Sequence, residues 1–170
     1  DLSQSGMLFS PSIDNHDNIW IANPERNQIR IFDDQGNTLR NLQGENSNLK
    51  EPIGIFCLPN GEYLIGDKSE SSLKHFDAQD NLIHEVGKTG LGVDEIYFMA
   101  WHPKHGIFGA DYWNNQIVHF NNKLQVQSIY HKPGRRAGQL GKVAGLSVCN
   151  DQLAVGNFDG GKVQIFDLSS

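Results

Sequence analysis

Apolar and polar residues alternate along this chain in short runs. Clear examples are residues 28–32, Gln-Ile-Arg-Ile-Phe, and residues 162–166, Lys-Val-Gln-Ile-Phe, and Gly, Asn, Asp or Pro bounds most such runs. A period of two predicts short, half-buried β-strands separated by tight turns. No segment shows a sustained helical period, and 18 glycines suit a chain with many turns. We therefore expect an all-β protein.

The strands fall into a phrase that recurs four times. Each phrase is an apolar run ending in Asp or Asn, a polar turn, and a second run that closes on Phe followed by Asp or Asn. The paired runs are residues 19–23 with 28–33, 63–67 with 72–77, 107–111 with 116–121, and 153–157 with 162–167. The closing residues Phe32, Phe76, Phe120 and Phe166 are spaced by 44, 44 and 46 residues. Such regular spacing indicates one structural unit used repeatedly.

Each phrase is flanked by further strand-like runs. Residues 38–42 and 82–86 follow a phrase, and small-residue runs at 53–57, 98–101 and 143–148 precede one. Four antiparallel strands in a unit of about 40–45 residues are typical of a β-propeller blade. We expect the small-residue run to be the innermost strand, where Gly54, Ala100 and Gly145 would relieve crowding. The predicted fold is a β-propeller of four-stranded blades, four in number, the last lacking its outer strand.

Three segments resemble the repeat of NHL propellers. They are Glu-Pro-Ile-Gly-Ile at 51–55, Asp-Asn-Ile-Trp-Ile-Ala-Asn at 17–23, and the run at 27–36, and Gly-Gln-Leu at 138–140 is similar to the family's connector between blades. The family's Asp is Asn at positions 23 and 157, and its Arg is replaced by Gln28, Ser72, Gln116 and Lys162. The resemblance implies one NHL-like propeller or partial propeller over residues 1–170, with blades near 2–45, 46–90, 91–136 and 137–170.

Propellers of this family usually close with more blades than the chain shows. The resemblance therefore implies that this chain alone does not close the ring. We expect either further blades in a larger propeller or neighbouring copies that cover the ends, because uncovered blades favour aggregation.

Composition narrows the possible partners. The formal charge is −6, from 14 Lys and Arg against 20 Asp and Glu, which disfavours nucleic-acid binding. The basic group His131, Lys132, Arg135 and Arg136 is interpreted as a solvated loop. No apolar stretch is long enough for a membrane helix, so we expect a soluble chain without membrane insertion. The sequence does not predict the cellular compartment, and a secreted or periplasmic location is compatible with it. Cys57 and Cys149 are expected to be small, buried, free thiols.

The histidines do not predict a metal site. His75 and His119 occupy a repeat position that elsewhere holds Ile31 and Ile165, which indicates packing. His102 and His105 flank a turn and could supply two ligands, whereas zinc usually requires three or four. We predict no metal and no cofactor.

The repeated residues Asn23, Asp67, Asp111 and Asn157 allow two interpretations. They could form an axial ring of ligands, or they could accept backbone N–H bonds in the following turn. Repetition in every unit favours the second, because a turn needs such an acceptor each time it is built.

Residues that break the repeat are better candidates for function. The third unit carries Tyr112, Trp113 and Asn114 in a loop where the first has Pro, Glu and Arg, and it adds Trp101 to its small-residue strand. Exposed aromatic residues are common anchors in recognition surfaces, so we assign these four residues to ligand or partner binding, with packing an equally weighted alternative. No nucleophile–base set or phosphate-binding loop is present.

The predicted function is therefore a non-enzymatic scaffold that binds a protein partner or copies of itself. The alternative is a hydrolase or lyase acting in the axial funnel of a larger propeller. RNA binding is disfavoured by the negative charge.

Overall fold

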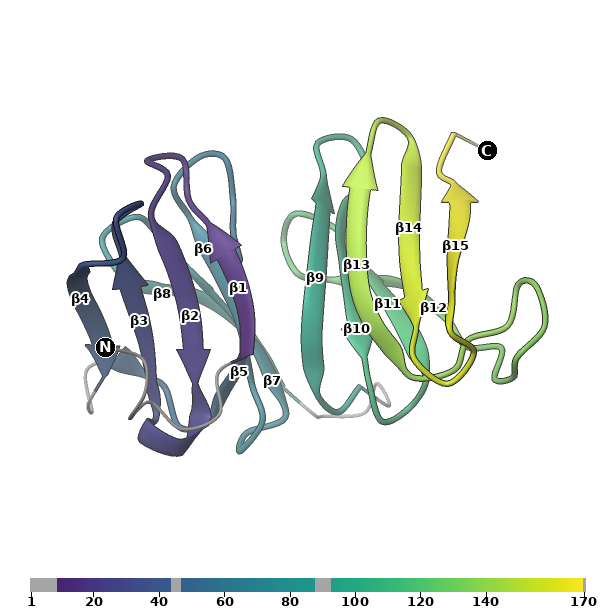
Figure 1. The fold of residues 1–170 in the computed structure, drawn as a ribbon, viewed down its shortest axis with the longest axis horizontal. Coiled ribbons are helices and arrows are strands. Elements are labelled where there is room, and N and C mark those ends of the chain that lie inside the picture. The colour runs from purple at the N-terminus through teal and green to yellow at the C-terminus, as the bar shows by residue number, and fades with distance from the viewer. Residues whose placement is uncertain (1–8, 44–46, 88–92, 170) are drawn as a thin grey trace. The chain divides into compact units, whose positions relative to one another are not determined.

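The computed structural model describes residues 9–43, 47–87 and 93–169 (Figure 1). The chain divides into two compact units, residues 1–89 and 90–170, which are described separately below. Within the described residues, no helix has the length and apolar character that crossing a membrane requires. The predicted boundaries near 45 and 90 lie outside the described residues, and the one near 136 falls between strands β12 (Val126–Tyr130) and β13 (Val143–Cys149).

Unit 1 contains two antiparallel four-stranded sheets in which neighbours in sequence are neighbours in the sheet. The first comprises β1 (Phe9–Ile13), β2 (Ile19–Asn23), β3 (Gln28–Phe32) and β4 (Thr38–Gln43). The second comprises β5 (Pro52–Cys57), β6 (Tyr63–Asp67), β7 (Ser72–Phe76) and β8 (Leu82–Val86). A 3₁₀ turn, η1 (Pro24–Arg26), joins β2 to β3.

Unit 2 repeats this plan with one difference. Its first sheet comprises β9 (Ile96–His102), β10 (Gly106–Asp111), β11 (Gln116–Phe120) and β12. Its second sheet has three strands, β13, β14 (Gln152–Asn157) and β15 (Lys162–Asp167). Among the described residues β15 pairs only with β14, as the prediction of a missing outer strand requires.

The register of the strands explains the regular spacing in the sequence. In each sheet the closing Phe of the third strand lies opposite the first apolar residue of the second, namely Ile19, Tyr63, Ile107 or Leu153. Because one residue of slip would turn every side chain to the wrong face, this register is strongly specified.

Each unit has its own hydrophobic core between its two sheets. In unit 1, Ile29 and Ile31 of the first sheet join Ile55 and Ile65 of the second, all at most 2% exposed. In unit 2, Ile117 belongs to the corresponding cluster with Leu153 and Val155. Burying one such side chain contributes roughly 1.5–3 kcal/mol, so contacts between neighbouring sheets are a major source of stability.

The acid or amide after each closing Phe holds the next turn. Asp77 Oδ1 accepts the backbone N–H groups of Gln79 and Asn81, and its Oδ2 accepts the Asn81 side-chain amide at 2.9 Å. The hydrogen bonds from Asn81 and Gln79 lower the pKa of Asp77 below its ordinary value. Asp33 and Asn121 accept the same two backbone N–H groups in their own sheets, so this repetition is structural.

Two sequence-based expectations were wrong in detail. Cys149 is exposed and only Cys57 is partly buried, although both are free, because Cys149 ends β13 at its turn. A Cβ added at Gly145 would meet no atom within 4 Å, so crowding does not explain that glycine. Crowding does explain Gly106, at φ +90°, where a Cβ would lie 2.4 Å from the carbonyl oxygen of Phe120.

Candidate functional site

Three of the four repeated acids and amides at the ends of the second strands hold the backbone of their own sheet. Asp67 is fully buried, and its carboxylate accepts the backbone N–H groups of Lys50 and Glu51 at 2.8 and 3.0 Å. Asp111 accepts the N–H of Asp94 at 2.8 Å, and the amide oxygen of Asn157 accepts that of Gly141 at 3.0 Å. The structural interpretation is supported, but the main donors lie before the first strand of the sheet rather than in the following turn.

The aromatic loop predicted from the sequence lies in unit 2, between β10 and β11. Trp113 is 54% exposed, Tyr112 is half-buried, and their rings meet edge to face with centroids 5.2 Å apart. Tyr97, near the start of β9, packs against Tyr112 at 5.3 Å. The indole N–H of Trp113 donates to Glu95 Oε2 at 2.9 Å, which holds the ring in one orientation.

Asn114 stabilises this loop. Its backbone N–H and its side-chain amide donate to the two carboxylate oxygens of Asp111 at 3.3 and 2.9 Å. The residue therefore positions the two aromatic side chains, and its assignment to direct ligand contact stays a prediction.

Besides Tyr97, sequence reasoning missed two further members of this surface, Lys142 and Phe158. The ammonium of Lys142 lies 5.2 Å from the Tyr112 ring and 4.8 Å from the Trp113 ring, a geometry typical of cation–π contacts. Phe158 is 72% exposed, and its backbone N–H donates to the carbonyl of Lys142 at 2.8 Å. Phe158 follows Asn157 as Tyr112 follows Asp111, so the two aromatic residues occupy equivalent positions of the repeat. Comparing these positions in the sequence could have identified Phe158.

Trp101 does not lie with the loop. It pairs with Ile107 near the opposite end of β9 from Tyr97, and its indole N–H donates to Asn122 Oδ1 at 3.3 Å. At about 3.3 Å per residue along a strand, that separation places Trp101 outside the surface formed by Tyr97, Tyr112, Trp113, Lys142 and Phe158, which we call the aromatic surface.

A cluster of possible metal ligands occurs elsewhere in unit 2. Asp151, in the turn between β13 and β14, has its Oδ1 3.5 Å from His102 Nε2 and 3.8 Å from His105 Nε2. The three donor atoms lie within 4.8 Å of one another. The sequence predicted the nearness of the two histidines but missed the carboxylate, which comes from a different hairpin.

The hydrogen bonds of His102 oppose metal binding by this cluster. Its Nδ1 accepts the backbone N–H groups of Lys104 and His105, both at 3.1 Å, so this nitrogen carries a lone pair. A neutral imidazole then has its proton on Nε2, which faces Asp151 as a donor. A histidine that binds metal through Nε2 needs the opposite tautomer, with Nδ1 donating. The arrangement therefore caps a turn as Asp14 does in the first sheet.

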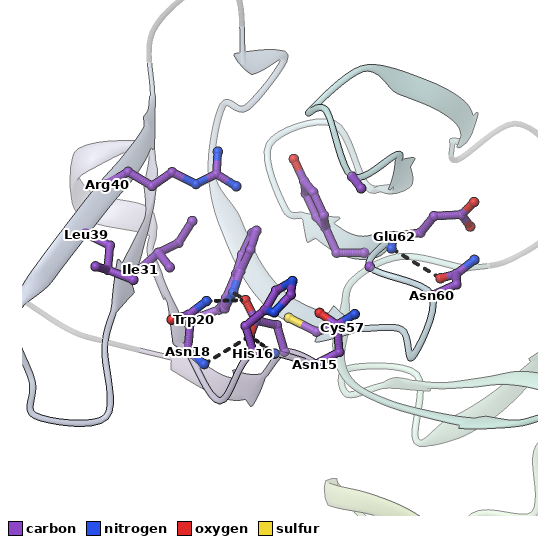
Figure 2. A pocket seen from close by; sticks show the side chains of 14 residues that line it. Asn15, His16, Asn18, Trp20, Ile31, Leu39, Arg40, Cys57, Asn60 and Glu62 are labelled. Atoms are coloured by element: carbon purple, nitrogen blue, oxygen red, sulfur yellow. Dashed lines mark hydrogen bonds between the residues drawn. The ribbon is translucent and has the colours of Figure 1, made fainter.

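Unit 1 contains a pocket of about 370 Å³ between its two sheets (Figure 2). Trp20 and Tyr63 line it, with ring centroids 4.9 Å apart. Arg40 forms an ion pair with Asp80, which also accepts the Tyr63 hydroxyl at 2.9 Å. Tyr63 breaks the repeat, since the equivalent residues are Ile or Leu.

The polar groups that line this pocket bond to one another, between the sheets through Arg40 and Asp80 and within the first sheet through Asp14. Asp14 Oδ2 accepts the indole N–H of Trp20 at 2.8 Å and the Asn18 amide at 2.9 Å (Figure 2). Burial raises the pKa of the Cys57 thiol to about 12, which makes it a poor nucleophile near neutral pH. The pocket thus lacks an activated nucleophile among its lining residues.

The basic group is an exposed but well-anchored loop. His131, Lys132, Arg135 and Arg136 are all exposed, as the sequence indicated. The ammonium of Lys162 donates to the carbonyls of Arg135 and Arg136, both at 2.6 Å. Leu140 of the Gly-Gln-Leu connector is fully buried in the core of unit 2.

Comparison with known proteins supports the fold. No protein-family model matches the chain, and no curated protein matches it in sequence. A chain in the crystal structure of the mitotic checkpoint complex is similar with a TM-score of 0.69 and 16% identity over 96% of this chain. Virginiamycin B lyase from Staphylococcus aureus is similar with a TM-score of 0.64 and 11% identity over 99% of this chain.

These likenesses and the repeated antiparallel sheets show an all-β fold of the β-propeller class. The chain spans about half the length of the solved structures that it matches, 47% and 58% respectively. At these identities, the comparisons establish the fold alone.

Proposed function

We propose that the chain is a non-enzymatic binding scaffold whose aromatic surface contacts a protein partner. The observation that carries the proposal is the exposure of Trp113 and Phe158, at 54% and 72%, in loops fixed by hydrogen bonds. Large aromatic residues on rigid loops lose little conformational entropy on binding and are frequent hot spots. The similar chain from a mitotic checkpoint complex belongs to a protein assembly, which is consistent with this role.

We further propose that the repeats are of the NHL type. The proposal is supported by the runs at 51–55, 17–23 and 27–36 and by the buried Leu140 of the connector. The enzyme alternative has less support, because Nδ1 of His102, in the cluster with His105 and Asp151, accepts the N–H groups of the turn.

Copies of this chain are alternative partners, because Val163 and Ile165 are 69% and 58% exposed on β15. Sedimentation over a range of concentrations tests this alternative. A species heavier than one chain that grows with concentration is expected for self-association, and a monomer throughout would contradict it.

Peptide display tests the main proposal and requires no identified partner. A random peptide library is selected on the purified chain, and the enriched peptides are measured on the Trp113→Ala and Phe158→Ala variants. The matched control is Ile83→Ala, which removes a 50% exposed apolar side chain in unit 1. Loss of a hot spot costs about 2 kcal/mol or more, so we expect a roughly 30-fold weaker affinity for Trp113→Ala. Equal binding by both aromatic variants and the control would contradict the proposal.

A further inference from the structure

The pocket between the two sheets of unit 1 has the size and the lining of a small-molecule site. Its volume of about 370 Å³ falls within the range of roughly 300–1,000 Å³ that is typical of ligand pockets. Its lining residues lie between Asp14 and Ala78 and are all described. Trp20, Ile31 and Tyr63 are the buried part of this lining, at 5%, 2% and 2% exposed.

The mouth of the pocket has an apolar side and a polar side. Leu39 of β4, 53% exposed, lies beside Ile31 on the apolar side (Figure 2). The polar side consists of Asn15 and His16, in the turn between β1 and β2, and Asn60, in the turn between β5 and β6 (Figure 2). A ligand in this pocket therefore meets hydrocarbon on one side and hydrogen-bonding groups on the other.

The polar side offers groups that the fold does not use. Within the described part of the chain, the side chains of Asn15 and His16 have no hydrogen-bond or ion-pair partner. The amide oxygen of Asn60 accepts the N–H of Glu62 at 3.2 Å, which leaves its amide nitrogen available. The two turns are close together, because Asn15 Nδ2 would lie 4.0 Å from a Cβ added at Gly61. Amides and a neutral imidazole present both donors and acceptors.

The charges around the pocket favour a neutral ligand. Arg40, the only Lys or Arg among the described lining residues, is ion-paired with Asp80. Each carboxylate oxygen of Asp14 already accepts two hydrogen bonds, and Glu62 Oε2 lies 2.8 Å from His75 Nε2. An anion would meet two carboxylates and no unpaired cation, and a cation would compete with bonds already made. Burying a charge without a partner is costly.

We infer that this pocket binds a small neutral saccharide built of pyranose rings. A pyranose has C–H groups on its face and hydroxyl groups at its edge, and each hydroxyl both donates and accepts. The C–H face packs against Leu39 and Ile31, and the hydroxyl edge bonds to Asn15, His16 and Asn60.

The aromatic side chains of the pocket agree with this class of ligand. Trp20 and Tyr63 contact each other with centroids 4.9 Å apart and planes tilted by 47°, so they leave no slot for a flat heteroaromatic ring. The site lies in unit 1 and is independent of the proposed function, which concerns the aromatic surface of unit 2.

A panel of sugars titrated into the ¹⁵N-labelled chain tests the inference by NMR. The probes are glucose, galactose, mannose and N-acetylglucosamine, each as the free sugar and as the methyl glycoside. We expect saturable shifts with at least one of them, at the backbone amides of Asn15 and Asn60 and at the indole N–H of Trp20. Equal binding of the methyl glycoside indicates the end of a glycan chain as the natural source, and its loss indicates a free sugar. The uronate and the 2-amino derivative of the sugar that binds are expected to bind at least five-fold more weakly.

Three variants separate this site from other causes of binding. Asn15→Ala is expected to weaken the sugar about five-fold, the effect of one lost hydrogen bond, and to leave the urea midpoint unchanged. The matched control Gln35→Ala removes an exposed amide from the turn between β3 and β4, outside the pocket, and should bind like the parent. Trp113→Ala should also bind like the parent.

Three results would overturn the inference. The first is a panel in which no sugar gives saturable shifts at the pocket. The second is a charged derivative that binds as tightly as its neutral parent sugar. The third is unchanged sugar affinity in Asn15→Ala.

Discussion

Lys74 offers a sharp test of how unit 1 is held together. This side chain is only 2% exposed, and its ammonium donates to Asp67 Oδ2 at 3.1 Å, Glu70 Oε2 at 2.6 Å and the carbonyl of Asn48 at 2.5 Å. Burial opposes its charge, but the hydrogen bond to Glu70 and the charge of Asp67 outweigh burial and raise the pKa of Lys74. The lysine therefore remains charged at neutral pH.

The equivalent positions in the last sheet indicate which substitutions to make in this test. At the positions of Asp67 and Lys74, the last sheet has Asn157 and Gln164, a neutral pair. Lys74→Gln alone removes the cation that pairs with the fully buried Asp67 carboxylate. Removing one partner of a buried ion pair costs about 3–5 kcal/mol. The double variant Asp67→Asn with Lys74→Gln removes both charges, so we expect a loss of about 1 kcal/mol.

Urea denaturation followed by circular dichroism measures these losses, and a double-mutant cycle gives the coupling between the two residues. A positive coupling of about 2 kcal/mol or more is expected. The reasoning is refuted if Lys74→Gln costs less than about 1 kcal/mol, or if the double variant is less stable than the single variant by a further similar amount.

Two further predictions concern acid and thiol chemistry. Burial opposes ionisation of Asp14, but hydrogen bonds from Asn18 and Trp20 outweigh it and keep the folded-state pKa of Asp14 below 3.8. The contribution of this carboxylate to the free energy of unfolding is therefore present at higher pH and is lost as pH falls through that lowered pKa. Urea midpoints between pH 6 and pH 3 are therefore expected to fall less in Asp14→Asn than in the parent, and equal slopes would contradict this. A thiol reagent at pH 8 is expected to modify exposed Cys149 rapidly and Cys57 slowly, so Cys149→Ser should remove the fast phase; a fast phase that survives this change is the opposing result.

The sequence predicted the strands well because the same local requirements act in each repeat. The closing Phe must face the core, and its acid or amide must hold the next turn, as Asp77 does with Asn81. Both requirements are local, so they appear as a fixed spacing. For this reason β2 to β11 and β13 to β15 lie within a residue or two of their expected positions.

Contacts between hairpins were not predictable in the same way. Asp151 meets His102 only because two turns of unit 2 come together, and nothing local to either turn indicates the other. The burial of Lys74 depends on the acids around it, and the repeat did not indicate it, because the equivalent positions hold Arg30, Val118 and Gln164. Aromatic residues that broke the repeat pointed to the loop of Trp113, while Trp101 broke the repeat without joining it.

Hydrogen exchange on the intact chain tests the central claim, that one sheet plan is used four times and that the last copy has three strands among the described residues. The account predicts slow exchange for β3, β7 and β11, which are paired on both sides, and fast exchange for alternate amides of β15, which is paired on one side. Uniform protection of β15 at the level of β11 would contradict it.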